Sequence, residues 1–197
     1  GATHHSLEDL AILRSIPNLQ VCAPADSLEL EAQLRQAIAE GQPTYIRIGK
    51  KGEPDLLAEH ASLGIGKANL LKQGKKILLL GIGPILSEAL QASTMLEQQG
   101  IQMAIASMGS IKPLDENFLR KRVKENYSHW FTLEEHQKQG GLGSTILEWM
   151  NENSIAGIRT KAIGIENKFI NELGPREYSI AREGIDSFGI VKTICKT

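Results

Sequence analysis

The stretch KKILLLGIGPILSEALQASTMLEQQG, residues 75–100, indicates the class of fold. Its apolar run Ile77–Ile82 is the longest in the chain and has the length of a buried strand. A Gly-Pro turn follows, after which apolar residues recur at helical spacing, at Ile85, Ala89, Ala92 and Leu96. Gly100 closes this helix, and residues 101–106 read as another strand. A buried strand, a tight turn, an amphipathic helix and a second strand are typical of a parallel α/β sheet.

Strands and helices continue to alternate on the C-terminal side of this unit. The pattern predicts, in chain order, a helix over 115–124, a strand over 130–133, a helix opened by Gly143-Ser144, a strand over 162–165 and amphipathic segments over 175–182 and 186–195. On the N-terminal side, residues 65–71 and 76–80 flank Gln73-Gly74, which suggests an antiparallel hairpin. From residue 63 on, the chain is expected to form a complete three-layer α/β/α domain with a mostly parallel sheet.

The first 48 residues read as helix, strand, helix, strand. The first helix has Ser6 as its expected cap and stops at Pro17, and the second lies between its cap Asp26 and Gly41. An apolar stripe marks the second helix, at Leu30, Leu34, Ala37 and Ile38. The two strands are expected at Leu19–Ala23 and Thr44–Ile48. This pattern is half of a parallel α/β sheet, and the polar residues 49–62 mark a boundary, so we expect domains at 1–54 and 55–197.

Composition excludes several classes of protein. The chain has 197 residues, with 22 Lys and Arg against 23 Asp and Glu, and this balance excludes a polycationic nucleic-acid binder and any global attraction to acidic membranes. No apolar run is long enough to span a bilayer. Two isolated cysteines, Cys22 and Cys195, indicate a reducing compartment, so we expect a cytoplasmic protein. No secretory signal is visible, and because the chain begins at Gly1 we expect a processed or partial protein.

Two glycine motifs resemble nucleotide-binding loops. Gly81-Ile-Gly83 follows a strand and precedes a helix, but Leu86 replaces the third glycine of a dinucleotide fingerprint, so a plain strand-to-helix turn is the preferred interpretation. The segment from Gly140 to Ser144 opens a helix and could bind an anion through its N–H groups. Tight packing of that helix on the sheet explains these glycines as well and is preferred.

Several charged side chains and histidines lie where ligands are usually bound. Glu134-Glu-His136 closes a strand, and a carboxylate that orients a structural histidine is preferred there to a metal site. His4 and His5 directly precede a helix, where a histidine can bind a substrate hydroxyl or phosphate and move protons. Arg47, Lys50 and Lys51 follow a strand, so either anion binding or a solvated linker accounts for them.

These segments, taken together, resemble the transketolases. Residues 1–19 and Pro24-Ala-Asp match the G-x-T-H-x-x-x-E-D, R-x-I-P-N and P-A-D run of that family. The C-terminal part resembles its C-terminal domain, at Ser110–Asp115, Glu134–His136, Gly140–Ser144, Ile163–Ile165, Phe169 and Gly174. The resemblance therefore covers the whole chain, and it implies the end of a pyrimidine-binding domain followed by a transketolase C-terminal domain.

The resemblance implies an enzyme that moves a two-carbon ketol unit between sugar phosphates with thiamine diphosphate and Mg²⁺. By position, His4 matches the catalytic histidine of the G-x-T-H motif, and His5 stands beside it as a substrate-binding residue. Lys50 falls near the arginine that binds substrate phosphate, and Arg47 is the alternative. A lysine there would act as a point charge and not as a bidentate fork.

The residues that hold the cofactor in this family have no counterpart in the chain. We therefore expect no cofactor to be bound to this chain alone. One hypothesis is a C-terminal portion, inactive alone, that completes a composite site with a missing N-terminal region or subunit, in a homodimer. The other is a non-catalytic assembly or regulatory module. Deoxyxylulose-phosphate synthases and the β subunits of 2-oxoacid dehydrogenases share this domain pair, although the Thr3–Asp9 run favours transketolases. Because a half sheet leaves a strand edge free, we expect residues 1–48 to pack on a second chain or to rearrange.

Overall fold

A five-stranded sheet organises the C-terminal part of the protein. The computed structural model describes residues 6–49, 52–58, 61–170 and 174–197. The sheet has the order β3-β5-β4-β7-β8, and its strands are β3 (Asn69–Lys72), β5 (Met103–Ser107), β4 (Ile77–Ile82), β7 (His129–Gln137) and β8 (Arg159–Ile165). β4, β5, β7 and β8 run parallel, and β3 pairs antiparallel with β5.

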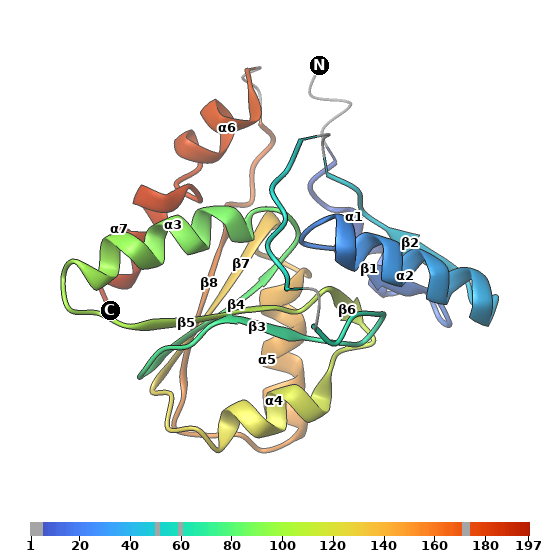
Figure 1. The fold of residues 1–197 in the computed structure, drawn as a ribbon, viewed down its shortest axis with the longest axis horizontal. Coiled ribbons are helices and arrows are strands. Elements are labelled where there is room, and N and C mark those ends of the chain that lie inside the picture. Colours follow the sequence, from blue (N-terminus) through green and yellow to red (C-terminus); the bar gives the residue numbers. More distant parts are fainter. Residues whose placement is uncertain (1–5, 50–51, 59–60, 171–173) are drawn as a thin grey trace.

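Helices cover both faces of this sheet (Figure 1). α3 (Leu86–Glu97) and α7 (Ser187–Ile194) lie on one face, with α6 (Arg176–Arg182) beyond the strand ends. α4 (Glu116–Val123) and α5 (Leu142–Glu152) lie on the other face. The three-layer α/β/α domain with a mostly parallel sheet is therefore confirmed.

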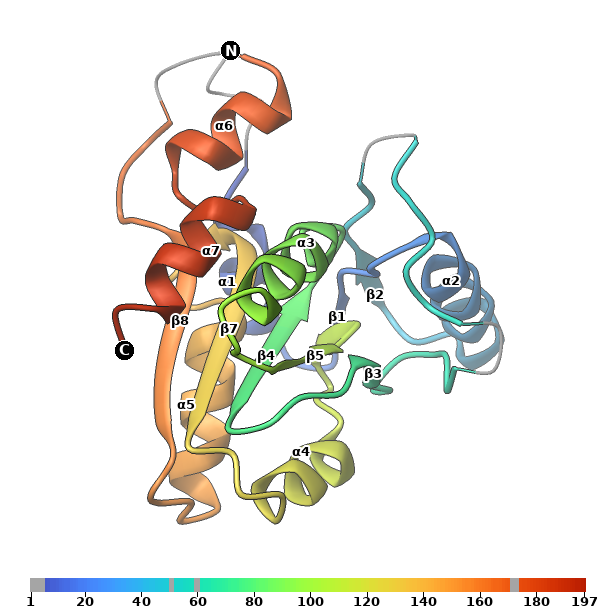
Figure 2. The same cartoon turned by 60° about the vertical axis from the view of Figure 1, so that its left-hand side comes forward.

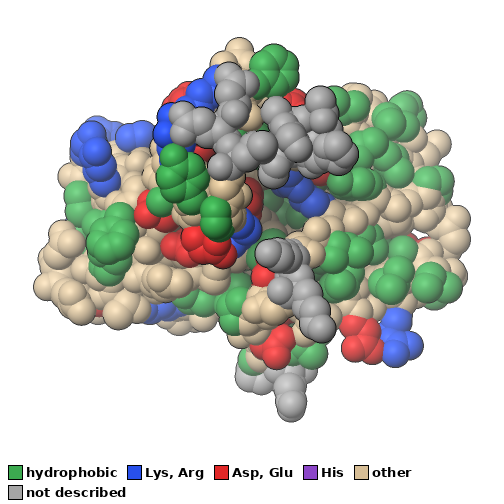
Figure 3. All heavy atoms as spheres, turned by 90° about the horizontal axis from the view of Figure 1, so that it is seen from above, with side chains coloured by type: hydrophobic (Ala, Val, Ile, Leu, Met, Phe, Trp, Pro, Cys, Tyr) green, Lys and Arg blue, Asp and Glu red, His purple; other side chains and the backbone are tan. Residues whose placement is uncertain are grey.

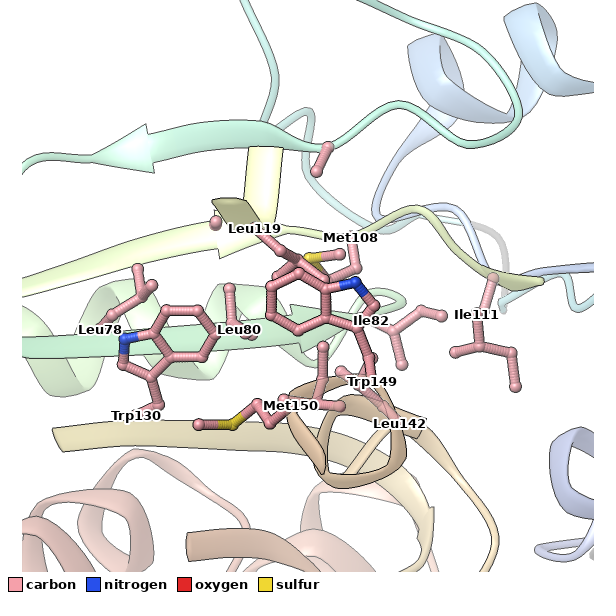
Figure 4. Packing of buried hydrophobic residues seen from close by; sticks show 14 of the residues in the cluster. Leu78, Leu80, Ile82, Met108, Ile111, Leu119, Trp130, Leu142, Trp149 and Met150 are labelled. Atoms are coloured by element: carbon pink, nitrogen blue, oxygen red, sulfur yellow. The ribbon is translucent and has the colours of Figure 1, made fainter. Parts of the chain in front are cut away.

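The alternation of side chains along β4 explains why the sheet needs two covers. Leu78, Leu80 and Ile82 pack with Trp130 in the core on the α5 side, and Leu79 packs with Phe131 in the core on the α3 side. Figure 4 shows the first of these cores, in which residues of α5 and β7 surround the β4 side chains. Burying these side chains supplies most of the driving force for this domain.

The N-terminal residues form a small sheet that includes a strand from the C-terminal part. Its elements are α1 (Asp9–Arg14), β1 (Gln20–Cys22), α2 (Ser27–Glu40) and β2 (Thr44–Ile46). β1 pairs parallel with β2 and, on its other side, antiparallel with β6 (Ser110–Lys112), a strand that the sequence pattern did not indicate. One edge of the half sheet is thus covered by this same chain. Figure 2 shows α2 and β2 of this unit at the opposite side of the molecule from the C-terminus.

α2 buries two polar residues and exposes two of its apolar ones. Glu29 and Gln33 are fully buried, whereas Leu34 is 48% exposed and Ile38 is 74% exposed. The polar face docks on main-chain groups of the C-terminal part, because the Gln33 amide donates to the Gly109 carbonyl at 3.0 Å. The apolar stripe is therefore not a core face in this chain. Figure 3 shows hydrophobic side chains gathered on this side of the molecule.

Two local predictions were wrong. β3 and β4 do not form a hairpin, because β5 lies between them in the sheet. At Gly74 the connecting loop passes so close to β5 that a Cβ atom would lie 2.1 Å from the Ala104 nitrogen, which accounts for the glycine better than a hairpin turn. Ser6 does not cap α1, since that helix begins at Asp9 with Glu8 in the cap position. Asp26 and Gly41, in contrast, cap and end α2 as expected.

The helices that the structure describes are short, and the longest of them, α2, has 14 residues. Among the residues that the structure describes, no helix combines the length and the apolar character that crossing a bilayer requires.

Candidate functional site

A cavity of about 260 Å³ lies where the N-terminal unit meets the carboxyl ends of the C-terminal strands. Its walls come from the residues before α1, the segments after β1 and β2, the turn between β4 and α3, the end of β7 and the start of α6. The lining residues are Ser6, Leu7, Ala23, Arg47, Ile48, Gly49, Glu53, Ile82, Gly83, Pro84, Ile85, Glu135 and Arg176. Ligands of α/β proteins usually bind at the carboxyl ends of parallel strands, which makes this cavity the candidate site.

Arg47 joins the two units at this cavity. Its guanidinium donates to the Glu135 carbonyl at 2.9 Å and to the Ser6 carbonyl at 3.1 Å, and it pairs with Asp9 at 3.2 Å. The other oxygen of Asp9 accepts a hydrogen bond from the Tyr45 hydroxyl at 2.7 Å. Burial, together with this carboxylate, raises the pKa of Tyr45 to about 12, so the phenol stays a donor. The Arg47 charge is therefore engaged by neighbouring groups of the protein.

Glu135 and Arg176 form an ion pair on the opposite wall. The Arg176 Nε donates to both carboxylate oxygens, at 3.1 and 3.0 Å, and its Nη2 donates at 2.7 Å. Both side chains are about a quarter exposed, at 27% and 28%. The pair fixes the start of α6 against the end of β7.

Three consecutive residues at the end of β7 hold the N-terminal segment. Besides the Glu135 carbonyl, the Ala11 N–H donates to His136 Nε2 at 3.3 Å, and the Gln137 N–H donates to the Leu7 carbonyl at 2.9 Å. His136 is fully buried, and its Nδ1 donates to the Gln137 carbonyl at 2.6 Å. Burial lowers the pKa of His136, so its ring is neutral and acts as both donor and acceptor. We name Glu135, His136 and Gln137 the β7 latch.

Glu134 has a separate role at the start of α5. Its carboxylate accepts from the Leu142 N–H at 2.7 Å and from the Gly143 N–H at 2.9 Å. Burial raises the pKa of Glu134 to about 7, against the opposing effect of these hydrogen bonds. The acceptor at this helix N-terminus is thus a carboxyl side chain of the same chain. Glu134 lies 3.6 Å from His136, so the Gln137 carbonyl and Ala11, and not this carboxylate, orient the imidazole.

The glycine motifs are explained by packing. A Cβ atom at Gly141 would lie 1.9 Å from a Glu134 oxygen, and one at Gly143 would lie 2.9 Å from the Thr132 hydroxyl. One at Gly81 would lie 2.4 Å from Leu86, which belongs to the helix that follows the turn. Within the described residues, no group of three or more His, Cys, Asp or Glu side chains is placed to hold a metal ion.

The candidate residues chosen from the sequence are only partly visible in this geometry. His4, His5 and Lys50 lie outside the described residues. Ser6 follows His5 in the chain and Gly49 precedes Lys50, and both Ser6 and Gly49 line the cavity. Arg47 lies in the cavity wall with its charge engaged. Arg176 was missed, because its partner Glu135 is 41 positions away and nothing local in the sequence marks the pair.

Comparison with known proteins places this geometry in a family. Residues 66–187 match the model of the transketolase C-terminal domain, and residues 1–53 match that of the transketolase pyrimidine-binding domain. The chain belongs to the transketolase family.

Individual relatives include two kinds of enzyme. A 1-deoxy-D-xylulose-5-phosphate synthase of Halothermothrix orenii is 37% identical over 198 residues, which is 100% of this chain and 31% of that protein. One subunit of an apulose-4-phosphate transketolase of Phocaeicola vulgatus is 34% identical over 194 residues, which is 98% of this chain and 61% of that subunit. The transketolase-family chain thus spans under two thirds of the length of these curated relatives.

Solved structures agree with the fold. A structure described as a split gene transketolase, inactive beta4 tetramer, superposes with a TM-score of 0.90 at 31% identity, over 100% of this chain and 63% of the other. A transketolase of Campylobacter jejuni superposes with a TM-score of 0.72 at 21% identity, over 100% of this chain and 29% of the other, which shows the fold alone.

Proposed function

We propose that this chain is the C-terminal portion of a transketolase-type enzyme that transfers a two-carbon ketol unit between sugar phosphates. One observation carries the proposal. Ser6 and Gly49, the chain neighbours of His5 and Lys50, line one cavity at the carboxyl ends of β4 and β7. Two segments that are about 40 residues apart in the chain therefore converge at one site.

We assign the following roles to the residues of the N-terminal segment. His4 donates to or accepts from the hydroxyl groups of the ketose donor and moves their protons, and His5 contributes to the same binding site. Lys50 binds the substrate phosphate. Arg47 is the weaker candidate for that role, because its guanidinium already serves Asp9 and the carbonyls of Ser6 and Glu135. Arg47 and the β7 latch hold the segment that carries these groups.

Thiamine diphosphate and Mg²⁺ belong to the complete enzyme in this proposal. When bound, the cofactor supplies the nucleophilic carbon that attacks the ketose carbonyl. The family models that match this chain are those of the pyrimidine-binding and C-terminal domains, and neither is the domain to which the resemblance assigns the diphosphate and Mg²⁺. We therefore assign cofactor binding to a partner region or subunit, and binding of the cofactor by this chain alone is not expected.

The outward face of α2 supports such a partner. Leu34, Ile38 and Ile48 are 48%, 74% and 68% exposed on the N-terminal unit. β2 lies at the edge of its sheet, so a further strand could pair with it. We propose that the rest of a pyrimidine-binding domain covers this surface, in an assembly that contains two copies of this chain.

Two alternatives to ketol transfer by this chain are each supported by one of the comparisons. The identity to 1-deoxy-D-xylulose-5-phosphate synthases favours that reaction within the same family. The similarity to a split gene transketolase whose tetramer is described as inactive favours a non-catalytic assembly module.

The test of the proposal mixes this chain with a partner polypeptide that carries the diphosphate-binding domain and the rest of the pyrimidine-binding domain. We expect ketol transfer by the mixture and by neither component. Formation of 1-deoxy-D-xylulose 5-phosphate instead would select the first alternative, and a confirmed complex without either activity would select the second. Calorimetry with thiamine diphosphate and Mg²⁺ supplies an independent readout, since measurable binding by this chain alone would contradict the assignment to a partner.

A further inference from the structure

A second cavity, of about 310 Å³, lies between the edge strand β8 and the C-terminal helix α7. Its lining includes Lys138, Lys161, Gly164, Glu166, Glu183, Gly184, Gly189, Lys192, Thr193 and Lys196. It shares no lining residue with the candidate site described above. We name this cavity the lysine groove.

The charges of the lysine groove are unbalanced. Its two glutamates are already neutralised, because Glu166 pairs with Lys138 and Glu183 pairs with Lys168, the latter at 2.9 Å. Lys161, Lys192 and Lys196 form no ion pair or hydrogen bond through their side chains with any residue that the structure describes. Three uncompensated cations therefore converge on one cavity in a chain whose net charge is −1.

Ordinary structural roles explain only part of this arrangement. A lysine on an edge strand prevents pairing with another chain, which accounts for Lys161 on β8. A lysine in the last turn of a helix interacts favourably with the negative end of the helix dipole, which accounts for Lys192 on α7. The same role extends to Lys196, the second residue after α7, but neither role accounts for the gathering of all three lysines around a single hollow.

The walls of the groove admit a close approach to the main chain. Gly184 leaves the groove open, since a Cβ atom there would meet no other atom within 4 Å, and the Thr193 hydroxyl also lines it. At Gly189 the glycine is required by packing, since a Cβ atom would lie 2.1 Å from the Gly184 carbonyl oxygen. Small residues beside flexible ammonium groups suit a compact anion of high charge, which lysines bind as point charges.

We propose that the lysine groove binds an oligophosphate anion, either free or as the phosphate chain of a nucleotide. This proposal stands apart from the proposed ketol transfer, because the two sites have no residue in common. The cavity of about 310 Å³ is open to a short phosphate chain, and three ammonium groups offset most of the negative charge of such an anion.

The test is calorimetric titration of the purified chain with inorganic triphosphate at low and at high salt. We expect one saturable site that weakens with salt. Affinity should fall at least tenfold in the triple variant Lys161→Ala, Lys192→Ala, Lys196→Ala. The matched control Lys75→Ala, Lys121→Ala, Lys124→Ala removes three exposed lysines elsewhere and should bind as the original chain does. Circular dichroism checks that both variants are folded.

Amide chemical shifts locate the site independently of the variants. Triphosphate should shift the signals of Gly164, Gly184 and Gly189. A parallel titration with a nucleoside triphosphate identifies the source of the phosphate: equal affinity indicates the free anion, and at least tenfold tighter binding indicates a nucleotide. Absence of binding, equal weakening in both triple variants, or shifts confined to other regions would overturn the proposal.

Discussion

Arg47 is one of the residues that join the two units, through the Glu135 carbonyl, and it also holds Asp9 and the Ser6 carbonyl within the N-terminal unit. Arg47→Ala removes two hydrogen bonds to carbonyls and leaves Asp9, whose side chain is 10% exposed, without its cation. We expect the free energy of unfolding to fall by about 2–3 kcal/mol, because a partly buried charge loses its partner. Urea denaturation measures this loss. The control Arg35→Ala breaks an exposed pair with Glu31 and should cost about 0.5 kcal/mol or less. Equal losses in the two variants would contradict the role of Arg47.

Glu29 makes stability depend on pH. Burial raises its pKa from 4.5 to about 7, so between these values the folded state holds a proton that the unfolded state has released. Stability contributed by this group is present at low pH and is lost as pH rises toward 7 and above. Glu29→Gln removes the titration and keeps the shape of the side chain. Relative to the original chain, the variant should gain on the order of 2–3 kcal/mol between pH 5 and pH 8.

Urea denaturation at four pH values between 5 and 8 measures this difference. The control is Glu31→Gln, on the exposed side of the same helix, whose stability difference from the original chain should not vary with pH. If Glu29→Gln behaved like that control, Glu29 would be ionised in the folded protein at pH 5 and the argument from burial would be wrong.

The role of a residue was predictable from the sequence where its neighbours in the chain determine that role. Asp26 caps α2 by accepting from the Glu29 N–H, as the local sequence indicates. The packing role of Gly141 and Gly143 was also predictable from their place at a strand-to-helix turn. The ion pair of Glu135 with Arg176 was not, because it forms only once β7 and α6 are folded together.

At the scale of elements, Gly74 determines how the chain enters β4. Gly74→Ala would place a Cβ atom 2.1 Å from the Ala104 nitrogen, which is main chain of β5 and cannot move aside as a side chain does. We expect a loss of about 1–3 kcal/mol in the free energy of unfolding. Thermal unfolding followed by circular dichroism measures this loss. The control is Gln73→Ala, a substitution at an exposed neighbouring residue that should leave the stability unchanged. A stable Gly74→Ala protein would indicate that this loop has room to shift.

The elements themselves were mostly visible in the sequence, and their partners were not. Apolar runs predicted β4, β5 and the apolar parts of β7 and β8, because strands buried on both faces are rich in apolar residues. The pairing of β3 with β5 rests on contacts between distant residues, so the expected hairpin was wrong. Periodicity located α2 correctly but could not show that its apolar side faces outward.

At the scale of the whole molecule, the exposed stripe of α2 is the surface that we assign to a partner. The double variant Leu34→Glu, Ile38→Glu should leave the chain folded, since both side chains are already exposed, and should abolish its assembly with the partner polypeptide. Sedimentation velocity of the mixture measures this assembly. Leu147→Glu is the matched control, because Leu147 is 51% exposed on α5, outside the N-terminal unit. Normal assembly of the double variant would remove α2 from the interface.

The central claim is that this chain contributes His4 to a composite site for ketol transfer. Its most direct test is the rate of ketol transfer by the mixture of partner and chain, with His4→Ala compared with His129→Ala, a substitution at the opposite end of β7 from the latch. The account predicts that His4→Ala assembles normally and lowers kcat at least a hundredfold, while His129→Ala retains the original rate. Equal rates for the two variants in a confirmed complex would contradict it.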